Sequence, residues 1–124
     1  MSNDELLFFD AYPRLLPLYQ ALEQVLVQRG MPFTVKAGRT QLSLRNRYVF
    51  AAVSLPWRRR KDWPEEFLLL SLGLGRKVEH PRISQAVEAY PGRWTHHILL
   101  TAPQELDETL LGWVEEAYRF ALEK

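Results

Sequence analysis

A strand followed by an amphipathic helix, in the last third of the chain, most constrains what this sequence can fold into. Residues 94–101 have the composition of a strand, and residues 102–107 turn the chain. Beyond the turn, apolar side chains recur at helical spacing up to Ala121. Residues 101–104 fit a capping box for this helix, and Asp107 is a second possible N-cap. A helix of this kind must bury its apolar stripe against another layer. The rest of the chain should therefore supply a sheet.

The middle of the chain predicts that sheet. Apolar and polar residues alternate at 33–37 and at 41–45, as in half-buried strands. Residues 48–55 and 66–74 are apolar on both sides, which indicates more deeply buried strands. The short turns between these runs favour an antiparallel meander, with residues 33–37 at its edge.

Helical segments are predicted before and within the meander. After a lead-in at residues 1–12, apolar spacing predicts a helix that ends at Gly30. Farther on, Pro81 predicts the start of a short helix that carries Ile83 and the apolar residues after it. Residues 1–124 should thus form a single α+β domain, with an antiparallel four- to five-stranded sheet packed by N- and C-terminal helices.

Period-two alternation sorts the side chains of the strands onto two faces. One face is rich in leucine and should lie beneath the helices: Leu42, Leu44, Leu68, Leu70, Leu72, Ile98 and Leu100. The other face mixes polar and apolar side chains: Gln41, Ser43, Arg45, Leu69, Ser71, Thr95, His97 and Leu99. A mixed face is seldom left bare. We expect a helix or a second copy of the chain to cover it, with a bound ligand as the remaining possibility.

Charge is distributed unevenly along the chain, although the net charge is only +1. Residues 29–93 hold 13 basic and 5 acidic side chains, whereas the two ends together hold 3 basic and 10 acidic ones. The meander gathers basic residues at two opposite ends of the sheet. One end is expected to hold Arg39, Arg58, Arg59, Arg60 and Lys61, and the other Arg45, Arg47, Arg76 and Lys77. Such asymmetry indicates an anionic partner; the alternative is that acidic helices pack beside a basic sheet and the fields cancel.

The segment from Trp57 to Trp63 places four consecutive cations between two tryptophans. Cations attract phosphate groups, and tryptophans stack on nucleic-acid bases. The alternative is a solvated loop whose tryptophans fold back onto the core and whose arginines pair with nearby acidic residues.

The sequence holds no catalytic or metal-binding signature. It has no cysteine, which excludes disulfides, thiolate metal sites and a thiol nucleophile and fits a cytoplasmic location. His96 and His97 are neighbours on a strand, so they point to opposite faces and cannot easily share one metal ion. We predict no metal, no cofactor and, because the apolar runs are too short to cross a bilayer, no membrane partner.

Several short motifs carry a resemblance to a known family, at residues 40–44, 48–51, 94–97, 106–108 and 117–118. They resemble a bacterial domain of unknown function that is sometimes appended to proteins labelled "predicted transport protein". The likeness covers about residues 30–122. The plan of the chain is also similar to MmcQ/YjbR-like proteins, small α+β domains proposed to bind DNA through hairpin "wings". The resemblance implies the same arrangement of helices and strands in this chain. The family of unknown function has no agreed biochemical activity to carry over.

We therefore expect a non-enzymatic binding module for nucleic acid or another polyanion. Its ligand-binding residues would be the nine cations at the two ends of the sheet, together with His97. The alternative is a protein-interaction or homodimerisation domain that uses the mixed face. A third hypothesis, a small enzyme or metabolite binder, predicts a closed pocket around His97, Ser43 and Thr95.

Overall fold

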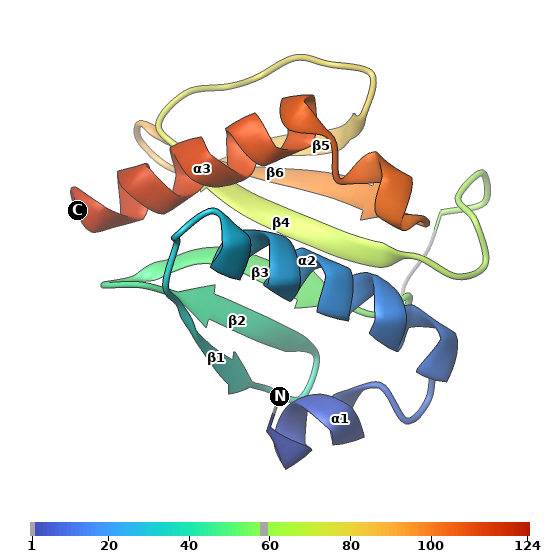
Figure 1. The fold of residues 1–124 in the computed structure, drawn as a ribbon. Helices are drawn as coiled ribbons and strands as arrows, with labels where there is room; N and C mark the ends of the chain where they lie inside the picture. Colours follow the sequence, from blue (N-terminus) through green and yellow to red (C-terminus); the bar gives the residue numbers. More distant parts are fainter. Residues whose placement is uncertain (1, 58–59) are drawn as a thin grey trace.

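The computed structural model describes residues 2–57 and 60–124, which form helices packed on one sheet (Figure 1). The elements follow in the order α1 (Asn3–Phe8), a 3-10 turn (Pro13–Leu15), α2 (Leu16–Gln28), β1 (Thr34–Ala37), β2 (Gln41–Arg45), β3 (Val49–Ser54), β4 (Leu68–Leu74), β5 (Ile83–Tyr90), β6 (Arg93–Leu100), a second 3-10 turn (Pro103–Glu105) and α3 (Glu108–Leu122). None of the helices in these two ranges is long and apolar enough to cross a membrane.

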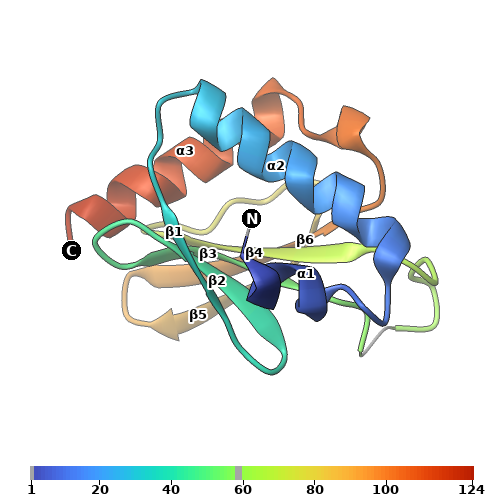
Figure 2. The same ribbon diagram turned by 60° about the horizontal axis from the view of Figure 1, so that its bottom comes forward.

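The sheet is antiparallel, with its strands in the order β1-β2-β3-β4-β6-β5. Helices α2 and α3 lie side by side on one of its faces, and α1 lies near the β1 edge (Figures 1 and 2). The predicted α+β class, the antiparallel pairing and the edge position of the first strand are confirmed. The sheet has six strands, one more than the upper bound of the prediction.

The additional strand is β5, where the sequence predicted a short helix. Residues Ile83–Tyr90 pair with β6 throughout their length and join it through the Pro91–Gly92 turn. Gly92 has a φ of +75°, a conformation that glycine adopts without strain. The helical prediction was wrong because the apolar spacing after Pro81 is weak. A neighbouring strand at the other end of a tight turn supplies hydrogen-bond partners along one side of β5.

The leucine-rich face is buried beneath the helices, as predicted. Each of its seven side chains is at most 1% exposed, and burial of each stabilises the fold by roughly 2 kcal/mol before entropy is counted. A register shift between β2 and β3 lets Phe50 and Ala51 both face the helices. Phe50 packs edge-on against Tyr118 of α3, with 4.9 Å between the ring centroids.

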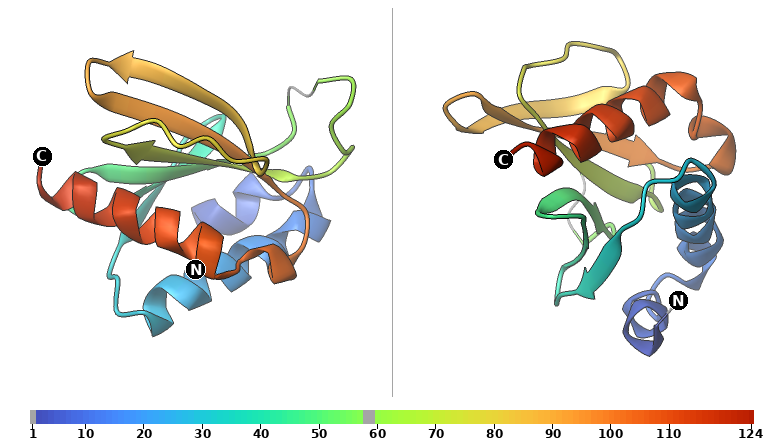
Figure 3. Two further views of the ribbon diagram at one scale, coloured as in Figure 1. Left: turned by 90° about the horizontal axis from the view of Figure 1, so that it is seen from above. Right: turned by 60° about the vertical axis from the view of Figure 1, so that its left-hand side comes forward.

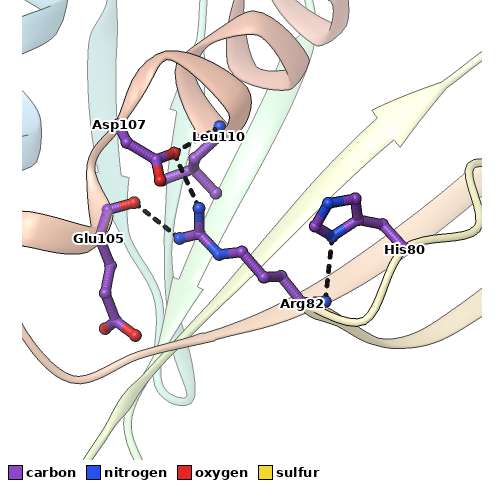
Figure 4. A network of polar contacts seen from close by, with 5 residues as sticks. All are labelled: His80, Arg82, Glu105, Asp107 and Leu110. Atoms are coloured by element: carbon purple, nitrogen blue, oxygen red, sulfur yellow. Dashed lines mark hydrogen bonds and ion pairs between the residues drawn. The ribbon is translucent and has the colours of Figure 1, made fainter.

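The start of α3 is tied to the start of β5 by a polar network (Figure 4). Asp107 caps α3, as predicted, because its carboxylate accepts a hydrogen bond of 3.0 Å from the Leu110 amide. Arg82 donates to the same carboxylate at 2.8 Å and to the backbone carbonyl of Glu105 at 2.6 Å. The network fixes the β5–β6 hairpin relative to the helix layer.

Candidate functional site

The mixed face of the sheet is not covered by a helix, so the expectation of helix cover was wrong. Both long helices lie on the leucine-rich side (Figures 2 and 3), and the mixed-face residues Ser43, Ser71, Thr95 and His97 remain half-exposed. We call this the open face. The strand registers and alternation assign to it Thr34, Lys36, Gln41, Ser43, Arg45, Val49, Ala52, Ser54, Leu69, Ser71, Gly73, Gln85, Val87, Tyr90, Arg93, Thr95, His97 and Leu99.

One row of mostly polar side chains crosses the open face from edge to edge. The pairings align Lys36, Ser43, Ala52, Ser71, His97 and Gln85, one from each strand. The side chains in the centre of this row are small, whereas the longer ones stand at the edges.

The open face has one sign of charge. Lys36, Arg45 and Arg93 belong to it, and the registers place no aspartate or glutamate among its residues. The charge imbalance contrasts with the net charge of +1 for the whole chain. A face lined by one sign of charge attracts ligands of the opposite sign and raises their local concentration.

A hollow of about 340 Å³ deepens the open face beside His97, within the range typical of small-molecule sites. It exists because Gly73 has no side chain: a Cβ built at this position would meet no atom within 4 Å. Ser71 and Thr95 line the hollow together with two cations, Arg93 on β6 and Lys124 beyond α3. No aspartate or glutamate side chain is among the lining residues.

The two cations lie close enough to influence each other. Burial lowers the pKa of the Lys124 ammonium, and the charge of Arg93 lowers it further. None of the ion pairs between described residues engages either side chain. The Lys124 ammonium lies over the Phe120 ring, 5.6 Å from its centroid, and both cations also line a neighbouring hollow with Glu123. An anion in the hollow would therefore meet two cations that no ion pair among the described residues already holds.

His97 is held by a neighbour in the same row. Its Nδ1 lies 2.8 Å from the hydroxyl oxygen of Ser71. When Ser71 donates this hydrogen bond, Nε2 of the neutral ring carries the proton and can donate to a ligand. Burial lowers the pKa of His97, and the adjacent His96 lowers it further, so the neutral ring is favoured at pH 7.

The pair of Ser71 and His97 does not form a catalytic dyad of the kind that activates a serine nucleophile. Such a dyad needs a third group, usually a carboxylate, to orient the imidazole. Among the described residues, Ser71 is the side chain that hydrogen-bonds the His97 ring, and no acidic residue shares the open face. The arrangement suits ligand binding better than acyl transfer.

His96 points to the opposite side of the sheet, as the alternation predicts. Its side chain is 1% exposed, and its Nε2 accepts a hydrogen bond of 2.9 Å from the Val78 amide. Burial is the main cause of its lowered pKa. His96 thereby anchors the connection between β4 and β5. Across residues 2–57 and 60–124, no group of three or more His, Asp or Glu side chains is placed to hold a metal ion.

The predicted cations at one end of the sheet lie around the β1–β2 turn and the loop after β3. Arg39 lines a hollow together with Asp4 and Asp10. Arg60 lies over the ring of Trp63, 5.4 Å from its centroid. Lys61 is exposed, and Arg58 and Arg59 lie outside the described residues.

The tryptophans that flank this basic segment both make ring contacts. Trp63 is half-buried and packs edge-on against Phe67, at 5.6 Å. Trp57 packs against Tyr12 at 5.4 Å but remains 52% exposed. These contacts are those expected of a loop whose tryptophans fold back onto the domain.

The predicted cations at the other end are more strongly engaged. Arg76 makes two hydrogen bonds to Glu116, of 3.0 and 2.9 Å. Lys77 pairs with Glu79 at 3.5 Å and lies over the ring of Trp94. The registers put Arg45 on the open face, and Arg47 lies over the Tyr48 ring. Two of the four cations predicted at this end therefore already face carboxylates.

Sequence reasoning missed three residues that line the hollow, namely Gly73, Arg93 and Lys124, and it missed Lys36 on the open face. A signal for Arg93 was present, because Arg93, Thr95, His97 and Leu99 alternate along one strand. The predicted strand began one residue too late to include it. The closed pocket predicted around His97, Ser43 and Thr95 is instead an open hollow, and Ser43 does not line it.

A family model described as "Domain of unknown function (DUF5655)" matches residues 7–121. The chain belongs to the DUF5655 family. The predicted membership of a family of unknown function is thereby confirmed. The DUF5655 match includes all six strands and hence the whole open face, whereas Lys124 lies beyond it. No curated protein and no solved structure matches the chain.

Proposed function

We propose that this DUF5655 domain is a non-enzymatic binding module that takes an anionic ligand on the open face of its sheet. The observation that carries the proposal is the charge of that face: Lys36, Arg45 and Arg93 belong to it, and the strand registers place no aspartate or glutamate there. Nucleic acid is the first ligand class to test, because a face with cations and no acidic residue attracts its phosphate groups.

The open face favours this site over the two ends of the sheet. At the ends, Arg76 and Lys77 are paired with carboxylates, and Arg39 shares its hollow with two aspartates. A ligand there would have to compete with these groups. On the open face, the cations, the Ser71 hydroxyl and the His97 ring point toward an uncovered surface.

The test is the binding of a short fluorescein-labelled single-stranded DNA, followed by anisotropy at about 50 mM salt and at higher salt. We expect binding that weakens as salt rises. The double variant Arg45→Gln/Arg93→Gln should weaken it more than Arg39→Gln/Arg60→Gln, which removes the same charge from one end of the sheet. A larger loss of DNA binding in the second variant would show that the DNA binds at that end of the sheet instead. Failure of both this DNA and inorganic phosphate to bind would reject the proposal.

Homodimerisation through the same face is the second candidate. It is favoured by three exposed apolar or aromatic side chains, Val49 (44%), Val87 (42%) and Tyr90 (68%). Against it, a face-to-face dimer would bring the cations of the two copies toward each other. Light scattering over a range of protein concentrations decides the matter, since a strict monomer excludes this function.

A further inference from the structure

We infer that the Gly73 hollow is a binding site for a small phosphate monoester. The inference rests on the proposed binding of anions at the open face and names the ligand class. It concerns one compact group seated at one place, rather than a polymer that runs along the sheet.

The donors around the hollow match a phosphate better than a carboxylate. Arg93 and Lys124 supply two positive charges, and the Thr95 hydroxyl and the His97 ring supply neutral donors. A phosphate monoester carries a charge of about −1.5 to −2 at pH 7 and three acceptor oxygens. A carboxylate has one charge and two oxygens, so it would leave part of this donor set unused.

The size and lining of the hollow favour a small ligand. About 340 Å³ is near the lower limit for small-molecule sites. Next to the donors, Val49, Ala52 and the bare backbone of Gly73 provide an apolar surface for the organic part of the ester. Tyr90 stands at the rim and is 68% exposed.

The centre of the open face offers no aromatic platform on which the bases of a nucleic-acid strand could stack. Sheets that bind single strands place aromatic side chains where successive bases stack. The central strands β3 and β4 present Ala52, Ser54, Leu69, Ser71 and Gly73 to the open face. These side chains offer little stacking surface, so binding energy should be concentrated in the hollow.

Two substitutions distinguish binding in the hollow from binding elsewhere on the open face. Gly73→Val should place an isopropyl group in the hollow and narrow it; a Cβ there is free of clashes, and valine suits a strand. Arg93→Gln removes one charge and leaves the hollow open. Gly112→Ala is the matched control for the first, since Gly112 lies on the exposed side of α3 and also has open space for a Cβ. Arg39→Gln is the charge-matched control for the second.

The experiment is calorimetric titration with ribose 5-phosphate and with adenosine 5′-monophosphate, and with uncharged ribose and adenosine as blanks. We expect both phosphates, but neither blank, to bind. Arg93→Gln should weaken binding by about tenfold or more, and Gly73→Val should abolish it. The two control variants should remain within about twofold of the unmodified protein. If only adenosine 5′-monophosphate binds, the site takes a nucleotide; if both bind equally, the phosphate and sugar suffice.

Three outcomes would overturn the inference: no binding of either ester, unchanged binding in Gly73→Val, or unchanged binding in Arg93→Gln. If Gly73→Val fails to fold, the inference is still tested by comparing ester binding in Arg93→Gln with ester binding in Arg39→Gln. Binding of the labelled DNA without binding of either ester would refute the small-ligand site and leave the proposed function intact. The two proposals therefore fail separately.

Discussion

A pair of carboxyl groups, Glu5 buried and Glu23 half-buried, should make the stability of this domain fall as pH rises. Tyr19 of α2 is fully buried and donates a hydrogen bond of 2.9 Å to the Glu23 carboxylate. Glu5 of α1, only 7% exposed, lies against the same group. Burial, and then the hydrogen bond with Glu5, raises the pKa of Glu23 from 4.5 to about 7.

The raised pKa of Glu23 determines the direction in which stability changes with pH. The folded protein holds the Glu23 proton more tightly than the unfolded chain does, so ionisation favours unfolding. The stabilising contribution of protonated Glu23 is therefore fully present below pH 4.5 and is lost as pH rises through about 7. At 1.36 kcal/mol per pKa unit the full difference would be about 3.4 kcal/mol. Because Glu23 is half-exposed and solvent screens its charge, we expect about 1–2 kcal/mol.

The assay is urea unfolding of the unmodified protein and of Glu23→Gln between pH 4 and pH 8. Glutamine can still accept from Tyr19, but it cannot ionise. The free energies of unfolding should agree at pH 4, and the variant should be more stable by about 1–2 kcal/mol at pH 8. The quantity to follow is the difference in free energy of unfolding between the two proteins. In each protein, the lowered pKa values of His96 and His97 make stability rise with pH below pH 6.5, and this effect cancels in the difference. A difference that stays constant from pH 4 to pH 8 would refute the account; exposed Glu66→Gln is the control.

Four further predictions follow from individual contacts. His96→Ala should lower stability by about 2–4 kcal/mol in urea unfolding, because it leaves a cavity and an unpaired Val78 amide. Tyr118→Phe should cost about 1 kcal/mol in the same assay, since the hydroxyl donates to the Pro32 carbonyl. Asp107→Ala should lower the melting temperature more than Asp107→Asn, which keeps the cap at Leu110 and loses only the charge opposite Arg82. Binding of a phosphate ester should raise the pKa of His97, which titration of its ring signals by NMR measures; an unchanged pKa would place the ligand elsewhere.

The sequence predicted most of the fold because four strands carry strong alternation or unbroken apolar runs. The leucine-rich face could be listed residue by residue, since period two alone assigns it. The strand β5 was missed because it lies at an edge, where most side chains are exposed and the apolar signal is weak. Its absence from the prediction also hid the hairpin that positions Tyr90 and Arg93.

The candidate site was less predictable than the fold. The mixed face and His97 were identified from alternation, but what covers such a face depends on where the helices pack. The hollow requires a glycine on β4, a cation at the start of β6 and the end of α3, three segments far apart in the chain. Among the cations that stood out in the sequence, Arg76 and Lys77 follow β4 and meet carboxylates instead of an open surface.

Methyl NMR during titration with adenosine 5′-monophosphate tests the central claim most directly, because methyl groups report on one face of a sheet at a time. The account predicts shifts at Val49 and Thr95 on the open face, whereas Val53 and Ile98 on the leucine-rich face should change little. Shifts confined to residues near Arg39 or Arg60, or to α2, would contradict it, since the anion would then bind away from the uncovered sheet.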